Sequence, residues 1–80
     1  MTRFPVDAPK PRVLRALCAL GFRVRREAEH IALARQNPDG SLTPMTIPNH
    51  AILKASTLRA ICIQAGIPRE DFLKAYETAR

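Results

Sequence analysis

Apolar residues recur at helical spacing in three segments of the chain. These are residues 10–20, residues 56–65 and a segment that opens at Pro68. A proline near the start of the first segment suits the first turn of a helix, and a glycine directly after each of the first two is typical of a helix end. We therefore predict three helices and expect Ser56 to cap the second one.

Between the first two helices the pattern changes to alternation, which is typical of strands with one buried face. The predicted strands span residues 22–26, 30–35 and 42–47. Asn37-Pro38-Asp39-Gly40, between the last two strands, is a strong turn signal. In the first strand Phe22 and Val24 are expected to face the core. Arg23 and Arg25 then share the solvent face.

The same pattern selects the pairing of the last two strands. A four-residue turn would place their apolar residues on opposite faces of the sheet. A shift of one residue, through a bulge or a five-residue loop, pairs Leu33 with Met45 and keeps one apolar face. It also pairs Ile31 with Ile47. In this preferred register His30 points outward, onto the face that carries the arginines and Thr46.

The order of these elements predicts an α+β fold of the form α-β-β-β-α with a short C-terminal helix. Its three-stranded antiparallel sheet is expected to carry helices on one face and to leave the other open. Residues 1–9 hold two prolines and no periodicity, so we expect an extended N-terminal arm followed by a single domain over residues 10–80. A domain this small buries a modest core, which favours a surface site and a polymeric substrate.

The net charge of +6 is concentrated in the first half of the chain. Residues 3–35 hold eight Lys or Arg against three Asp or Glu, whereas residues 36–80 hold five against four. Clustered positive charge attracts polyanions, so nucleic acid is the leading partner, with a membrane surface or an acidic protein as alternatives. The candidates for contacts with the phosphate backbone of a nucleic acid are Arg12, Arg15, Arg23, Arg25 and Arg26. The alternative for all of them is a solvated basic face.

The cysteines and the N-terminus exclude several classes of protein. Cys18 and Cys62 lie in apolar helical patterns, where we expect both to act as small hydrophobic residues. They have neither CxxC spacing nor histidines at ligand distances, so we expect no metal and no cofactor. Neither a signal peptide nor an apolar run long enough for a membrane helix is visible, so a cytoplasmic location is expected.

The two histidines are the candidates for proton transfer. If the nucleic acid is RNA, it carries its own nucleophile, the 2′-hydroxyl, and an imidazole with an ordinary pKa of about 6.5 can serve as acid or base at neutral pH. On the residues alone, a strand histidine with no task is the favoured interpretation of His30, and proton transfer is the alternative. His50, in the loop after the third strand, is a candidate second acid/base or phosphate contact, against the alternative of a solvated loop residue.

Anion binding is also expected at the start of the second helix. Lys54, Ser56 and Thr57 lie there, where free N–H groups and the helix dipole favour a phosphate. Helix capping alone explains Ser56 equally well. Aromatic residues are scarce, so we expect recognition of RNA by backbone and shape rather than by base stacking.

Three segments, in this order, resemble the HicA family of messenger-RNA-cleaving toxins. They are Lys10-Pro11-Arg12-Val13 through Leu20-Gly21-Phe22, then His30-Ile31-Ala32-Leu33, then Ile47-Pro48-Asn49-His50 with Lys54-Ala55-Ser56-Thr57-Leu58-Arg59 and Ile61 to Ala65-Gly66-Ile67. The resemblance implies a double-stranded-RNA-binding-like fold and a metal-independent mRNA interferase of a type II toxin–antitoxin pair. It further implies that His30 is the single catalytic histidine and that a HicB-type antitoxin covers the site.

The chain departs from the family pattern at two places. Ala28-Glu29 stands where the family commonly has Gly-Ser before its histidine, and Ser56 stands where it often has glycine. Glu29 puts an acid beside His30, which makes a non-catalytic RNA-binding module on the same fold the first alternative. A protein-interaction domain, whose basic face docks an acidic partner, is the second.

Overall fold

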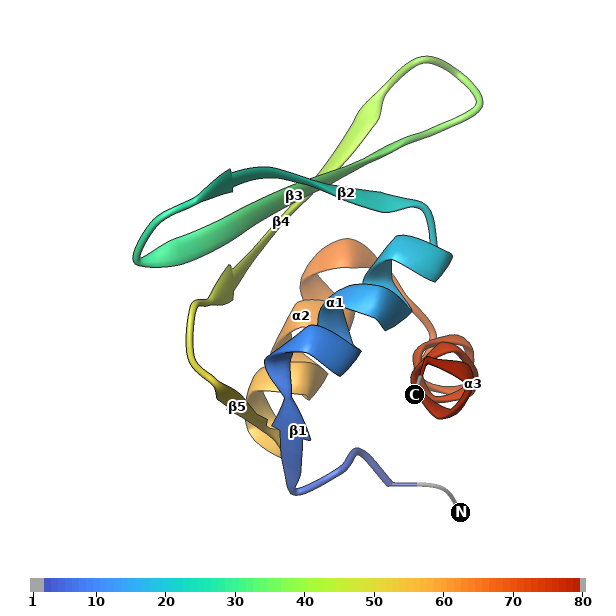
Figure 1. The fold of residues 1–80 in the computed structure, drawn as a ribbon. Coiled ribbons are helices and arrows are strands. Elements are labelled where there is room, and N and C mark those ends of the chain that lie inside the picture. The colour runs from blue at the N-terminus through green and yellow to red at the C-terminus, as the bar shows by residue number, and fades with distance from the viewer. Residues whose placement is uncertain (1–2, 80) are drawn as a thin grey trace.

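The computed structural model describes residues 3–79 (Figure 1). Three helices, a three-stranded sheet and a pair of short strands make up this part of the chain. In chain order the elements are β1 (Asp7–Pro9), α1 (Lys10–Ala19), β2 (Phe22–Glu27), β3 (His30–Gln36), β4 (Leu42–Pro48), β5 (Ile52–Lys54), α2 (Ala55–Ala65) and α3 (Arg69–Thr78).

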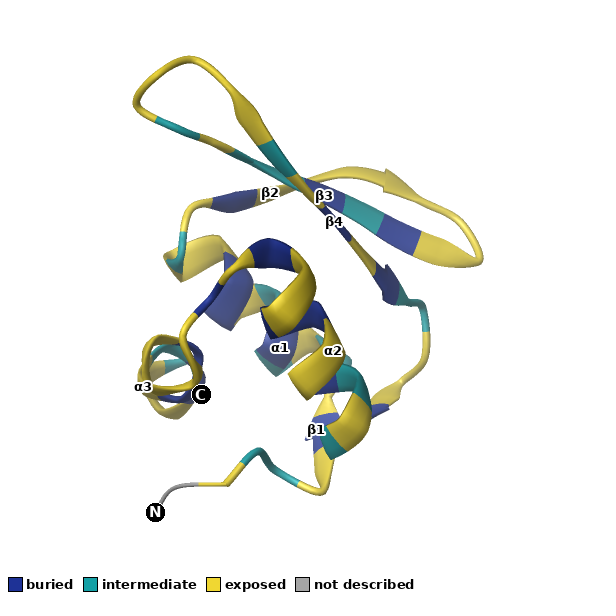
Figure 2. Cartoon of the chain, turned by 180° about the vertical axis from the view of Figure 1, so that it is seen from behind, coloured by how far each residue is buried: buried dark blue, intermediate teal, exposed yellow. Residues whose placement is uncertain are grey.

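The main sheet is an antiparallel meander in the order β2-β3-β4, and the helices lie on one side of it (Figure 1). Buried residues gather where α1, α2 and the sheet face one another, and the opposite face of the sheet is open (Figure 2). The predicted α+β class, with its double-stranded-RNA-binding-like order of elements, is therefore confirmed.

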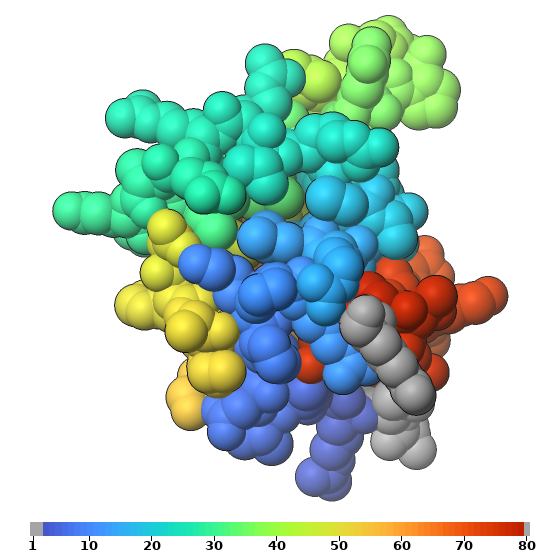
Figure 3. All heavy atoms as spheres, viewed as in Figure 1, coloured from blue at the N-terminus to red at the C-terminus, as the bar shows by residue number. Residues whose placement is uncertain are grey.

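The predicted register of β3 and β4 is also confirmed. Leu33 lies opposite Met45 and Ile31 opposite Ile47, and all four side chains are buried. Five residues, 37–41, connect the strands, because Gln36 is paired with Leu42. Within this loop the N–H of Asn37 donates to the carbonyl of Ser41 at 2.8 Å. This hairpin projects from the body of the molecule (Figures 1 and 3).

Val24 lies on the predicted core side of the sheet, opposite the buried Leu33, but its side chain is 39% exposed rather than buried. β2 is an edge strand, and a bulge interrupts its pairing with β3 between Val24 and Arg26. Only Phe22, at the start of the strand, is buried. A bulge bends the strand that carries it, and the rest of β2 lies where no helix covers it (Figure 2).

A two-stranded antiparallel pair, β1 with β5, was not expected from the sequence. Ala8 pairs with Leu53, and both are buried against the helices. Asp7 pairs with Lys54, and their side chains form an ion pair of 2.6 Å. Part of the segment expected to be an arm is thus paired with β5, the strand directly before α2. The boundary between arm and domain at residue 9 stays a prediction.

The second helix begins one residue earlier than expected, and Ser56 does not cap it. Lys54 is the capping residue, no side chain caps the helix, and Ser56 lies within the first turn. The helix ends as predicted at Gly66, whose φ of 67° lies in the left-handed region that favours glycine. The N–H of Ile67 then bonds the carbonyl of Cys62 at 2.9 Å, which closes the last turn.

The two cysteines, both expected to act as small hydrophobic residues, differ in environment. Cys62 lies in the core, and burial raises the pKa of its thiol to about 11. Cys18 is exposed, because the helix turns its neighbours Ala16 and Leu17 inward. Within residues 3–79 no helix combines the length and the apolar character that a membrane crossing needs.

This difference predicts selective alkylation of the native protein at pH 8. A thiol with a pKa of about 11 is ionised only about one part in a thousand at that pH, and Cys62 is also shielded. We expect iodoacetamide to modify Cys18 alone in the folded protein and both cysteines in guanidinium, as measured by peptide mass spectrometry. Equal rates at the two cysteines in the folded protein would contradict this placement.

Candidate active site and nucleic-acid interface

His30 begins β3 and lies on the open side of the sheet. It pairs with Pro48 of β4, and the next residue, Ile31, points into the core. Because successive side chains of a strand alternate between faces, the imidazole projects to the face opposite the helices. His30 is exposed, so a polymeric substrate can reach it.

A groove of about 390 Å³ runs beside His30, where the open face meets α2 at the edge of β4. Its residues come from three elements, β3, β4 and α2, which folding brings together. The sheet contributes His30, Thr46 and Pro48, and α2 contributes Ser56, Thr57, Ala60, Ile61 and Gln64. We call this hollow the His30 groove.

A hydrogen bond at the sheet edge holds α2 in place beside the groove. The backbone N–H of Thr46 points away from β3 and donates to Oε1 of Gln64 at 3.2 Å. An edge strand leaves such N–H groups without strand partners, and here a helix side chain accepts one of them. The contact fixes how closely the outer face of α2 approaches the face that carries His30.

Asn49 holds the turn that precedes His30. Its side-chain Nδ2 donates to the carbonyl of Ala28 at 2.8 Å, and its backbone N–H donates to the carbonyl of Glu29 at 3.2 Å. Lys10 in turn donates from Nζ to Asn49 Oδ1 at 2.6 Å. Sequence reasoning missed this residue, although it lies in the segment Ile47-Pro48-Asn49-His50 that resembles the HicA family most specifically.

The structure brings together some of the predicted site residues. Ser56 and Thr57 line the His30 groove. Arg26 pairs with Ala32, which shares the open face with His30 two residues along β3. Arg23 and Arg25 line a second hollow, of about 270 Å³, at the far end of the same face. Nη1 of Arg23 also donates to the carbonyls of Cys18 and Phe22, at 3.1 and 2.9 Å.

Other predicted residues lie elsewhere. Arg12 donates from Nε to the carbonyl of Tyr76 and stacks over that ring at 3.9 Å, so it ties α1 to α3. Arg15 lies on α1, in a hollow between α1 and α3. Lys54 is paired with Asp7. His50 is exposed in the loop after β4 and does not line the His30 groove.

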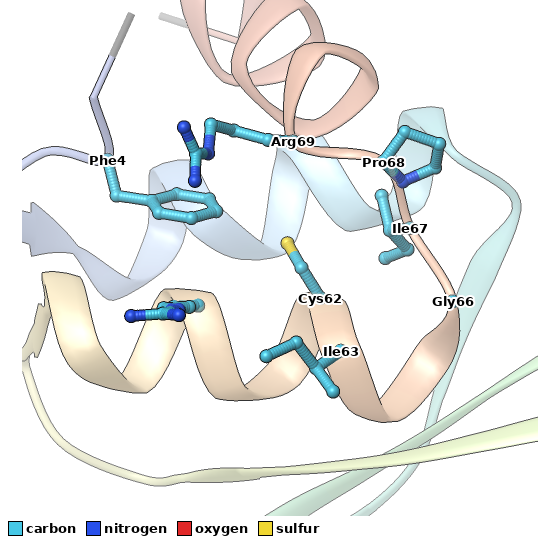
Figure 4. A pocket seen from close by; sticks show the side chains of 8 residues that line it. Phe4, Cys62, Ile63, Gly66, Ile67, Pro68 and Arg69 are labelled. Atoms are coloured by element: carbon cyan, nitrogen blue, oxygen red, sulfur yellow. The ribbon is translucent and has the colours of Figure 1, made fainter.

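A larger pocket, of about 490 Å³, lies on another side of α2 (Figure 4). Phe4, Cys62, Ile63 and Arg69 are among its lining residues, and the Arg69 guanidinium lies 5.6 Å from the centre of the Phe4 ring. Its one nucleophilic group is the Cys62 thiol, whose pKa is raised by burial. The His30 groove is therefore the better candidate for proton transfer.

The described residues contain no group of three or more His, Cys, Asp or Glu that could hold a metal ion. Lys54 with Asp7 is the one ion pair recorded within residues 3–79. The arginines of β2 therefore have no carboxylate partner within this part of the chain. Their charge is available to a phosphate backbone on the open face.

Fold and site together define a small α+β domain of double-stranded-RNA-binding-like order, with arginines and a groove-lining histidine on its open sheet face. The family model described as the HicA toxin of bacterial toxin–antitoxin systems matches residues 11–67, so the chain belongs to the HicA toxin family. This family consists of toxins of toxin–antitoxin pairs, which are generally ribonucleases. Comparisons with curated proteins and with solved structures gave no match.

The contacts of Asn49 predict a local structural role that can be measured. We expect Asn49→Ala to lower the free energy of unfolding by about 1–2 kcal/mol, because it removes two side-chain hydrogen bonds. His50→Ala, at an exposed neighbour, is the control and should change stability by no more than about 0.5 kcal/mol. Urea unfolding gives both values, and hydrogen exchange should increase at residues 28–30 in Asn49→Ala alone. Equal stability of the two variants would contradict the role of Asn49.

Proposed function

We propose that this chain is an endoribonuclease toxin, an mRNA interferase that cuts RNA without a metal and uses His30 as its general acid/base. Membership of the HicA family supports a ribonuclease in general. The observation that carries the finer proposal is the place of His30, exposed on the open sheet face and lining a groove beside the start of α2. A cytoplasmic site of action follows from a messenger-RNA substrate.

The reaction requires little more than proton transfer and stabilisation of charge. The 2′-oxygen attacks the neighbouring phosphorus as its proton leaves, and the bond from phosphorus to the 5′-oxygen breaks as that oxygen gains a proton. The products are a 2′,3′-cyclic phosphate and a 5′-hydroxyl. His30 accepts the first proton or donates the second. Because a single acid/base group contributes roughly 10²–10⁴-fold, a slow enzyme is expected.

The start of α2 is the proposed binding site of the reacting phosphate. No side chain caps this helix, so the N–H groups of its first turn remain free to bind an anion. Ser56 and Thr57 lie in that turn and line the groove with His30. Helix dipole and hydroxyl groups thus favour negative charge close to the imidazole.

The arginines of β2 are the proposed track for the flanking phosphates. Arg26 lies across the sheet from the groove, and Arg23 and Arg25 continue the face away from it. Strand β3 lies between β2 and the groove, and its residues on this face include Ala32 and Ala34. Because these side chains are small, a sugar–phosphate backbone can approach the sheet closely. A HicB-type antitoxin that covers this face would block the track and the groove together.

A non-catalytic RNA-binding module on the same fold is the second candidate. It is favoured by Glu29, an exposed acid directly before His30 that would repel a phosphate. Among the hydrogen bonds of the described residues, none involves the imidazole of His30, so no second side chain orients it. Both candidates bind RNA, and only the first cuts it.

Cleavage of a long single-stranded RNA in the presence of EDTA separates the two candidates. We expect the wild type to cut, His30→Ala to cut about 10²–10⁴-fold more slowly, and RNA affinity to stay within about twofold, because only proton transfer is lost. Gel electrophoresis and filter binding give the two readouts. A comparable loss in His50→Ala alone would move the acid/base role to that residue, and no cleavage by the wild type would favour the binding module.

The salt dependence of RNA binding tests the arginine track. Arg26→Gln should reduce the slope of log affinity against log salt by about 0.7, the value for one phosphate contact with a single strand. Arg15→Gln removes the same charge from the helical side of the molecule, so its slope should match the wild type. Fluorescence anisotropy at several salt concentrations gives the slopes. Equal reductions in both variants would place the RNA path elsewhere.

A further inference from the structure

We propose that the His30 groove receives one unpaired RNA base and that Gln64 selects it, a proposal that rests on the function proposed above. The groove has a volume of about 390 Å³, within the range of roughly 300–1,000 Å³ that small-ligand sites occupy. The strands β3 and β4 bound it on one side and α2 on the other. A base paired within a duplex cannot enter such a space, whereas a base turned out of its stack can.

The lining of the groove suits a flat heterocycle with a polar edge. Its apolar lining residues are Ile61, which is 3% exposed, Ala60 and Pro48 of β4. Its polar lining residues, besides His30, are Thr46, Ser56, Thr57 and Gln64. Its lining residues include no Phe, Tyr or Trp, so hydrogen bonds and shape, more than stacking on a large aromatic side chain, would hold the base.

The hydrogen bond from Thr46 fixes the orientation of the Gln64 amide. A backbone N–H can only donate, so the atom of Gln64 that faces it must be the oxygen, Oε1, at 3.2 Å. Nε2 is then left with two N–H donors, and none of the hydrogen bonds within residues 3–79 involves them. Gln64 therefore presents donors alone, which match the exocyclic carbonyl oxygen of uracil (O4) or guanine (O6) and oppose the exocyclic amino group of cytosine (N4) or adenine (N6) at the corresponding position.

The position of the groove joins base selection to cleavage. One set of residues, His30 with the first turn of α2, borders both the proposed base site and the proposed phosphate site. A base held in the groove would bring its own phosphate to the imidazole. The double-stranded-RNA-binding-like order of elements would then serve a single-stranded substrate.

Sequencing the cut ends of a randomised single-stranded RNA tests this inference. We expect the wild type to favour uracil or guanine at one position beside the cut. Gln64→Glu keeps an acceptor for the Thr46 N–H and loses the donors, so that position should shift toward cytosine or adenine by about tenfold. Thr78→Glu is the control, since it adds the same charge at the end of α3, and it should keep the wild-type profile.

Binding to uncut RNA provides a readout that does not depend on cleavage. A 2′-O-methylated single strand with one central uracil should bind the wild type at least about tenfold more tightly than the same strand in a duplex. Gln64→Glu should weaken that binding and lower the preference for uracil over cytosine, relative to Thr78→Glu.

Failure of the proposed ribonuclease function and failure of the proposed base site give different results. If the wild type does not cut RNA but binds the uracil strand through Gln64, the catalytic role of His30 fails and the base site stands. If single strand and duplex bind equally, or if Gln64→Glu and Thr78→Glu behave alike in both assays, the base site is overturned whatever happens to cleavage.

Discussion

The shared apolar face of β3 and β4 fixes which side chains the sheet turns toward solvent. Leu33 with Met45 and Ile31 with Ile47 are buried as opposed pairs, and a slip of one residue would expose all four. That constraint sends His30 to the open face, because it is adjacent in the strand to the buried Ile31. The candidate site is thus a consequence of core packing on the opposite side of the same strand.

Polar contacts at the sheet edges turn this face into a site. Gln64 accepts the unpaired N–H of Thr46 and sets α2 against β4, and Asn49 holds the turn before His30 while it accepts from Lys10. Each contact satisfies groups that strand pairing leaves free. The contact of Gln64 positions α2, which forms one wall of the groove, and the contacts of Asn49 position the backbone of His30. In an 80-residue chain with a modest core, such edge contacts position chemistry that a larger protein would place in a cleft.

The basic residues of the sheet and those of the helical layer differ in whether their charge is already engaged by the protein. The arginines of β2 have no carboxylate partner within residues 3–79, whereas Arg12 is engaged with Tyr76 in the helical layer. Equal numbers of basic residues in a sequence therefore do not contribute equally to binding of a polyanion. The open sheet face carries the free cations, the histidine and the groove, and these make it the expected meeting place of RNA and of an inhibitory antitoxin.

The sequence by itself determined the elements, the meander and the register, because alternation and helical spacing express which neighbours along one element are buried together. Leu33, Met45 and the outward place of His30 followed from that local pattern. Only the tertiary structure decided that Val24 is half-exposed beside a bulge in the edge strand, that Lys54 rather than Ser56 is the capping residue of α2, and that Cys18 lies outside the core. It also decided the roles of Gln64 and Asn49, whose partners lie 18, 21 and 39 residues away. Contacts over such separations depend on how finished elements pack, and no periodicity within one element encodes them.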